Sequence, residues 1–222
     1  MRINIVSGEA MMSYDRELGF KACIPFCESM VSGTVAETEP FSQNFIAERC
    51  RTLSTPVDKY RKKFANQLLK MRAGDDVHVY FGEDMFCQLN LITLLAYLER
   101  IGITKVTYHV VFEDEMKETA LIENVETAGY GEIYKQVLVN HGTIGTNLEI
   151  TDKAIMLYSD YLDDNGVIAS FIKANPNDTV LQLTVKMIRQ FAQYGLGDVQ
   201  SAELIERVRK TVAPTEDEQV TE

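Results

Sequence analysis

Apolar positions along the chain follow two successive periods, which predict strands that lead directly into helices. Near the middle of the chain, Val77, Val79 and Phe81 alternate with other residues, as in a half-buried strand. Beyond Gly82, which permits a sharp turn, Asp84 stands in an N-cap position. A helical spacing of three or four residues then begins, at Met85, Leu89, Ile92, Leu95 and Leu98. This segment is therefore predicted to be strand, turn and helix.

The amino-terminal part of the chain has the same order. A strand at residues 2–6 ends in Ser7-Gly8-Glu9, and a helix over about residues 10–18 leads to a second strand at 21–26. Helices at about 41–53 and 57–71 precede the central strand, and a fourth strand is expected at 105–112. Strands that alternate with helices predict an α/β fold. We expect an open, mainly parallel four-stranded sheet of the Rossmann-like or flavodoxin-like kind, in the order 2-1-3-4.

The second half of the chain shows helical periods and no confident strand. The expected helices cover residues 120–124 (a weak pattern), 130–141, 151–162, 166–174, 179–194 and 201–212. We therefore expect three regions. These are an α/β domain at residues 1–115, a mostly helical region at 116–212 packed on it, and a disordered acidic tail at 213–222.

Composition and charge argue against several classes of protein, namely nucleic-acid-binding, membrane-spanning and disulfide-rich proteins. The 222 residues are 45% hydrophobic and carry a formal net charge of -11, which opposes a broad nucleic-acid-binding surface. The densest basic group, which includes Arg49, is interpreted as a solvated face. No apolar run reaches the roughly 18 to 20 residues of a membrane span, and the four cysteines lack zinc or disulfide spacing. We expect a cytoplasmic protein that does not bind membranes.

Acidic and small polar residues follow the first and third predicted strands. In the expected strand order these two strands are neighbours, so the residues that follow them lie together at the carboxyl edge of the sheet. Four carboxylates that met there would repel one another unless a cation lay between them. A divalent metal such as Mg²⁺, which prefers oxygen ligands, would in turn bind phosphate. The predicted metal ligands are Glu9, Glu28, Glu83 and Asp84, and the predicted ligand-binding residues are Ser7, Gly8, Glu9, Glu28, Gly33, Gly82, Gln88 and Asn90.

Simpler explanations exist for each of these residues. Acidic residues in the first turn of a helix are common because they cap it and complement its dipole. Gln88 and Asn90 could face a ligand or bond to a neighbouring loop. Cys87 lies one turn into the central helix, where the helix amino terminus lowers the pKa of a thiol and favours a nucleophile. None of the three histidines stands at a spacing that would pair it with Cys87. We favour a buried Cys87 that behaves as a small hydrophobe.

The segment Tyr80-Phe-Gly-Glu-Asp-Met-Phe-Cys-Gln-Leu-Asn-Leu resembles a bacterial family of unknown function, the DUF family numbered eighteen thirty-five. The resemblance covers about residues 2–111. It extends to Ile5-Val-Ser-Gly-Glu9, to the acid-then-glycine loop Glu28 to Gly33, and to Arg49 on the next helix. Members usually carry Asp where this chain has Glu9 and Glu28. The resemblance supports the location of the site and implies no particular activity.

Three functions remain open at this stage, and no catalytic residue is predicted. The first is a Mg²⁺-dependent phosphoryl or phosphodiester enzyme, or a nucleotide-binding protein, acting at the acidic crevice. The second is a non-catalytic regulatory or adaptor domain, whose helical half would present a groove to a protein partner. The third is a thiol enzyme that uses Cys87.

Overall fold

The computed structural model describes residues 1–14, 23–33, 35, 37–112 and 117–212. The chain divides into two compact units, Met1–Ile155 and Met156–Glu222, and each is described here by itself. The predicted tail at 213–222 lies outside the described residues. The expected packing of a helical region on the α/β domain stays a prediction.

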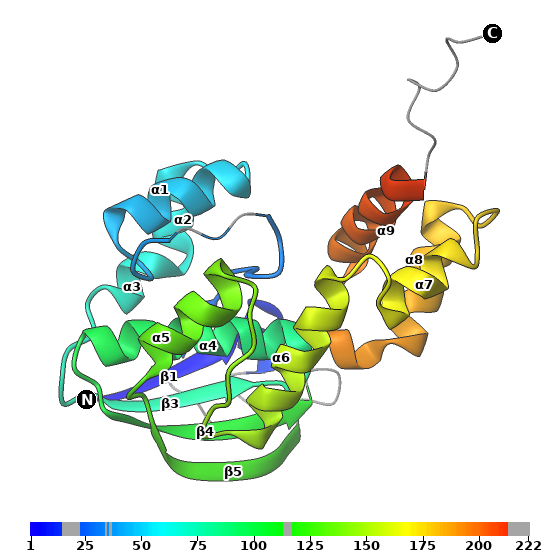
Figure 1. Ribbon diagram of the computed structural model, residues 1–222. Coiled ribbons are helices and arrows are strands. Elements are labelled where there is room, and N and C mark those ends of the chain that lie inside the picture. Colours follow the sequence, from blue (N-terminus) through cyan, green and yellow to red (C-terminus); the bar gives the residue numbers. More distant parts are fainter. Residues whose placement is uncertain (15–22, 34, 36, 113–116, 213–222) are drawn as a thin grey trace, which may run out of the picture. The chain divides into compact units, whose positions relative to one another are not determined.

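The first unit contains a five-stranded mixed sheet (Figure 1). Its strands, in the order β2-β1-β3-β4-β5, are β2 (Cys23–Phe26), β1 (Arg2–Ser7), β3 (Asp76–Phe81), β4 (Lys105–Phe112) and β5 (Lys117–Glu126). The first four run parallel, and β5 is antiparallel to β4. The α/β class, the mainly parallel sheet and the order of the first four strands are confirmed. A Rossmann-like or flavodoxin-like relationship stays a prediction.

The fifth strand corrects the sequence interpretation. Residues 120–124, predicted as a weak helix, belong to β5 and pair with β4, for example Tyr108 with Ile122 and Val110 with Ala120. Leu121, Glu123 and Asn124 on this edge strand are exposed and Val125 is buried, so the strand buries too few side chains to show a period of two. Ala, Leu and Glu favour helix, and pairing with a neighbouring strand overrides that preference here.

Most helices of the first unit lie over one face of the sheet (Figure 1). They are α1 (Gln43–Thr52), α2 (Val57–Tyr60) with the π-helix η2 (Arg61–Ala65) and α3 (Asn66–Leu68), α4 (Met85–Arg100), and α5 (Tyr130–Tyr134) with the π-helix η3 (Lys135–Val139). The 3₁₀ helix η1 (Ala10–Tyr14) lies at the other face, where Met11 packs with Val6 and Tyr80. Helices were predicted at 41–53, 57–71 and 130–141, and all three exist with somewhat shorter bounds. Only residues 10–14 of the helix predicted at 10–18 are helical, as η1, and the rest lies outside the described residues.

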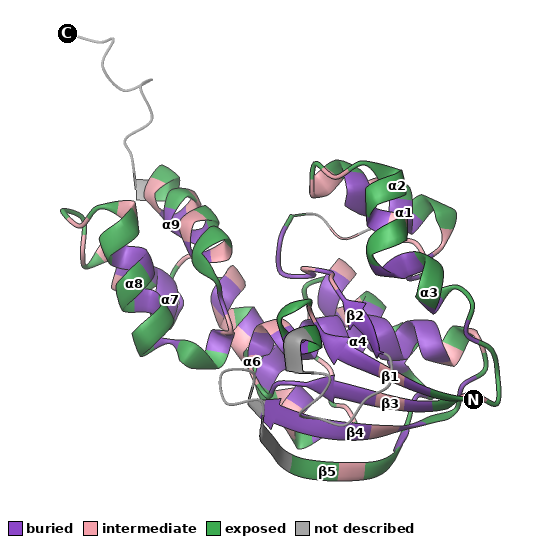
Figure 2. Ribbon diagram, turned by 180° about the vertical axis from the view of Figure 1, so that it is seen from behind, coloured by how far each residue is buried: buried purple, intermediate pink, exposed green. Residues whose placement is uncertain are grey.

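Helix α4 forms the centre of this unit (Figure 2). Thirteen of its sixteen residues are buried, including the polar residues Gln88, Asn90 and Thr93. Against the same layer pack Phe26, Phe41, Phe64 and Phe81, with neighbouring ring centroids 5.7 to 6.0 Å apart. A helix buried on all sides explains why its sequence shows only a weak division into apolar and polar faces.

The second unit consists of helices. It contains the end of α6 (Glu149–Leu162), then α7 (Val167–Lys173), α8 (Val180–Gln190), the 3₁₀ helix η4 (Ala192–Tyr194) and α9 (Asp198–Val212). Asp160 accepts hydrogen bonds from the Val167 amide at 2.7 Å and the Tyr194 hydroxyl at 2.6 Å, so it ties three segments together. Helices are present at all four places predicted from residue 151 onward, but the one predicted at 179–194 ends at Gln190 and is followed by the separate helix η4. No helix in the described ranges combines the length and apolar character needed to cross a lipid bilayer.

A pair of histidines joins β3 to β4 on the second face of the sheet. Nδ1 of His78 lies 3.0 Å from Nε2 of His109, whose ring stacks on Tyr80 at 4.1 Å. Arg2 places a guanidinium nitrogen 3.0 Å from Nδ1 of His78, and Asp76 lies 3.3 Å from Nε2. Because arginine can only donate, Nδ1 of His78 is an acceptor and the ring is neutral. Burial, followed by the charge of Arg2, lowers the pKa of His78.

This arrangement predicts a loss of stability at mildly acidic pH. The unfolded chain takes up a proton on His78 near the ordinary histidine pKa of 6.5, whereas the folded chain binds it only at lower pH. The free energy of unfolding should therefore fall as the pH drops below about 6.5. Urea unfolding between pH 7.5 and 5.5 measures this, and His78→Gln should flatten the dependence. The same change at exposed His141 should leave it intact, and equal slopes in both variants would contradict the assignment.

Candidate functional site

The carboxyl edge of β1 and β3 is the site that the sequence predicted. Arg2 to Val6 pair in parallel with Asp76 to Tyr80, so the turns after these strands lie at one edge. Gly8 has a φ of +79° and open space where a side chain would stand, and its amide donates to the carbonyl of Phe26 at 3.1 Å. The adjacency of the two strands, on which the predicted site depended, is confirmed.

Asp84 caps α4, as predicted. Its carboxylate accepts a hydrogen bond from the Cys87 amide at 2.9 Å, and burial raises its pKa. A Cβ on Gly82 would come within 2.6 Å of an oxygen of Asp84 and 3.3 Å of the sulfur of Cys87. Gly82 is therefore required for close approach of the turn to the helix. The capping carboxylate already occupies the place where an anion would meet the first amides of α4.

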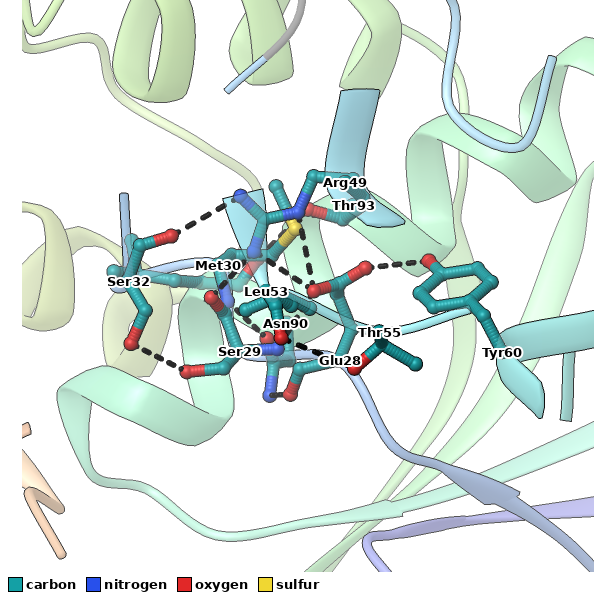
Figure 3. A network of polar contacts seen from close by, with 11 residues as sticks. Glu28, Ser29, Met30, Ser32, Arg49, Leu53, Thr55, Tyr60, Asn90 and Thr93 are labelled. Atoms are coloured by element: carbon teal, nitrogen blue, oxygen red, sulfur yellow. Dashed lines mark hydrogen bonds and ion pairs between the residues drawn. The ribbon is translucent and has the colours of Figure 1, made fainter. Parts of the chain in front are cut away.

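Glu28 lies in the loop after β2 and is held inside the protein (Figure 3). Its Oε1 accepts hydrogen bonds from Nε and NH2 of Arg49 at 3.1 and 2.8 Å, and from the Ser29 amide at 2.9 Å. Its Oε2 accepts a bond of 2.5 Å from the Tyr60 hydroxyl. Both side chains of the Glu28–Arg49 ion pair are fully buried. This carboxylate therefore has its hydrogen-bonding capacity filled without a metal.

The rest of the Glu28 loop is fastened from two sides. Arg49 donates to the carbonyls of Ser32 at 3.1 Å and Ser29 at 2.7 Å. The side chain of Asn90 accepts from the Met30 amide at 3.0 Å and donates to the carbonyl of Glu28 at 2.9 Å. Of the two roles that the sequence left open for Asn90, the structure shows the bond to a neighbouring loop.

Gln88 and Gly33 also have structural contacts. Gln88 donates to the Gly82 carbonyl and the Tyr108 hydroxyl, each at 2.6 Å, and accepts from the Thr151 hydroxyl at 2.8 Å. It therefore connects the central turn, β4 and the start of α6. Gly33 has a φ of +67° and leaves no room for a side chain beside Thr52.

The four predicted metal ligands are not brought together. Glu9 forms an exposed ion pair with Lys63 at 3.0 Å, Glu83 is exposed, and the carboxylates of Glu28 and Asp84 have the internal partners described above. In the part of the chain that the structure describes, no three His, Cys, Asp or Glu side chains are grouped so that they could hold a metal. The loop that carries Glu28 turns this residue inward to Arg49, away from the other three acids. Metal binding by these residues stays a prediction.

The thiols at this edge are shielded. Cys87 is 2% exposed, and its sulfur lies 3.2 Å from the hydroxyl of Ser7, which is 4% exposed. Burial raises the pKa of Cys27 to about 11, so this thiol is protonated at neutral pH. This geometry agrees with our preference for Cys87 as a small buried side chain.

Sequence reasoning missed the central role of Arg49, which was assigned to a solvated basic face. In α1 the buried residues are Phe45, Ile46, Arg49 and Cys50. Arg49 thus stands four residues after Phe45, on the apolar side of its helix. That position was the available signal. It indicated a buried cation that needed an acidic partner.

Comparisons with protein-family models, with curated proteins and with solved structures found no match to this chain. The resemblance to the DUF family numbered eighteen thirty-five therefore stays a prediction.

Removing one partner of the buried ion pair should destabilise the protein more than neutralising both partners. Arg49→Met leaves the Glu28 carboxylate buried without its cation and should lower the free energy of unfolding by about 3 to 5 kcal/mol. Adding Glu28→Gln to that variant should restore at least about 1 kcal/mol, because the charge that lacked a partner is removed. Denaturant unfolding at pH 7 measures both changes.

The matched control is the exposed pair of Lys153 and Glu149 on α6, at 2.8 Å. Lys153→Met should lower the free energy of unfolding far less than Arg49→Met does, because water screens this pair. If Arg49→Met costs no more than this control, or if the Glu28 change makes Arg49→Met worse, the pair does not hold the loop as described.

Proposed function

We propose that this protein is a non-catalytic adaptor or regulatory module that binds a helical segment of another protein. One observation carries the proposal. Three apolar residues of α8 are exposed to solvent at the spacing of one helix face: Leu181 at 73%, Val185 at 43% and Ile188 at 42%. Aligned apolar residues at i, i+4 and i+7 are the pattern by which helices recognise one another. Scattered exposed apolar residues would carry no such meaning.

The other contacts of α8 support a rigid binding face. Leu183, Thr184 and Met187 are buried on the opposite side of the helix. At its start, Thr179 and Gln182 form a reciprocal capping box. The apolar stripe, by which we mean Leu181, Val185 and Ile188, therefore stands on a helix whose first turn and inner face are already held in place. Such a surface loses little conformational entropy on binding.

Charge identifies the partner. Residues 180–190 contain Lys186 and Arg189 and no acidic residue, although the whole chain has a net charge of -11. Lys186 pairs with Asp178 at 2.6 Å, so the charge argument rests on Arg189. A second copy of α8 would bring like charges together, which disfavours self-association through this stripe. We therefore propose an amphipathic helix with apolar residues on one face and Asp or Glu beside them.

Selection from a display library of helical peptides tests this function. Bound sequences should carry apolar residues at i, i+3 or i+4, and i+7, with acidic neighbours. For one selected peptide, the double variant Leu181→Ser, Ile188→Ser should raise Kd by about tenfold or more, because buried apolar area is lost. Val167→Ser, at an apolar residue of α7 that is 64% exposed, is the matched control.

A charge reversal separates the two parts of the proposal. Arg189→Glu should weaken binding of the acidic peptide, whereas Lys210→Glu on α9 should have much less effect. No selected peptide, enrichment of basic peptides, or an equal loss in the control variants would contradict the proposal.

A second candidate is a small phosphorylated ligand, such as a nucleotide, at the carboxyl edge of β1 and β3. It is favoured by the open space beside Gly8 and by Lys63, whose partner Glu9 is exposed and replaceable by an anion. The edge also holds the point where strand order reverses, which is where α/β sheets bind ligands. Because Asp84 occupies the amides of α4, the phosphate would contact Lys63 and the turn at Gly8.

Thermal unfolding with inorganic phosphate, AMP and ATP, each with and without Mg²⁺, tests this candidate. A bound nucleotide should raise Tm in proportion to its concentration above Kd. Lys63→Gln should abolish the shift, and Lys62→Gln, a neighbouring exposed lysine, should preserve it. A shift that needs Mg²⁺ and survives in Lys63→Gln would point back to a metal site. Equal Tm under all conditions would exclude the candidate.

A further inference from the structure

A cavity of about 260 Å³ that opens to solvent lies in the first unit, and its lining shares no residue with the two surfaces discussed above. It is bounded by the carboxyl-terminal end of α4, the amino-terminal end of α5 and the segment 37–40. At about 30 Å³ for each water, the volume equals roughly nine water molecules. It therefore suits an organic molecule of about nine non-hydrogen atoms and is too small for a nucleotide.

Most of the charged groups in this cavity already have partners. Both oxygens of Glu99 accept hydrogen bonds of 2.6 Å, from the amides of Gly129 and Gly131, so they cap α5. Arg100 donates to the carbonyl of Pro40 at 3.0 Å, pairs with Glu39 at 3.6 Å, and lies over the ring of Tyr97. These groups shape the wall and have little capacity left for a ligand.

Three polar groups of the lining are still available to contact a ligand. Among the described residues, the ammonium of Lys135 and the carboxylate of Glu37 have no hydrogen-bonding or ionic partner, and Oγ1 of Thr38 is buried with no hydrogen bond. A buried hydroxyl without a partner costs free energy, which a bound polar group would recover. The cavity thus offers one cation, one anion and one hydroxyl.

The remaining surface is apolar. Pro40, Ala96 and the ring of Tyr134 line the cavity between the charged groups. Its ligand should therefore carry an ammonium, a carboxylate and a compact apolar body. We propose that the cavity binds a free α-amino acid with a small apolar side chain, of the size of leucine. The carboxylate contacts Lys135 and the Thr38 hydroxyl, and the ammonium contacts Glu37.

Isothermal titration with L-leucine tests the proposal, with two analogues as probes. Isovalerate lacks the ammonium group and isoamylamine lacks the carboxylate, so each should bind at least about tenfold more weakly than leucine. Lys135→Gln should weaken leucine by a similar factor, whereas Lys105→Gln, at an exposed lysine on β4, should not. Absence of leucine binding at millimolar concentration, or equal binding of the three compounds, would overturn the proposal.

A cavity-filling variant keeps the test independent of folding defects. Ala96→Leu places extra apolar atoms in the cavity from a helix that is otherwise unchanged. This variant should unfold at the same temperature as the wild type or higher, since filling a cavity commonly stabilises, and it should lose leucine binding. A folded Ala96→Leu variant that binds leucine as the wild type does would show that the ligand lies elsewhere. Binding of the helical peptide at α8 serves as a separate readout that this variant should not change.

Discussion

The buried ion pair between Glu28 and Arg49 is the constraint around which the first unit is organised. Removing two charges from water costs several kcal/mol for each ion, and the pair is tolerable only when further hydrogen bonds fill both groups. Here Tyr60 and the Ser29 amide complete the carboxylate, and the carbonyls of Ser29 and Ser32 complete the guanidinium. The loop after β2 must therefore adopt one conformation, and α1 and α2 must lie where Arg49 and Tyr60 can reach it.

The polar residues of α4 belong to the same system. A helix that is buried on nearly every side must find an internal partner for each polar side chain it carries. Asn90 holds the Glu28 loop, Gln88 joins the central turn to β4 and α6, and Asp84 caps the first turn. A motif rich in acids and amides thus resembles a ligand-binding or metal site in sequence. In the structure these side chains hold segments of the chain together.

Because these polar groups have internal partners, our main proposals rest on two other places in the described residues, which differ in chemistry. The apolar stripe of α8 is exposed and flanked by basic residues, which suits an acidic helix. The cavity beside α5 combines Lys135, Glu37 and an apolar wall, which suits a small zwitterion. In our proposals, one unit binds a helical segment of another protein and the other binds a small metabolite, as a regulatory module would.

The sequence by itself determined the elements whose signals are local. The period of two at Val77, Val79 and Phe81, the glycine turns and the Asp84 cap depend on neighbouring residues, and the structure confirms them. The parallel direction of β3 and β4 followed from the rules for strands joined by a helix. The strand order, which these rules do not fix, is seen only in the structure. Only the tertiary structure decided β5, because an exposed edge strand has no apolar period of its own. The tertiary structure also decided which partners the acidic side chains contact. A carboxylate can bind either a metal ion or a guanidinium, so the residue type of Glu28 does not determine its partner. The partner depends on contacts between residues that are distant in sequence.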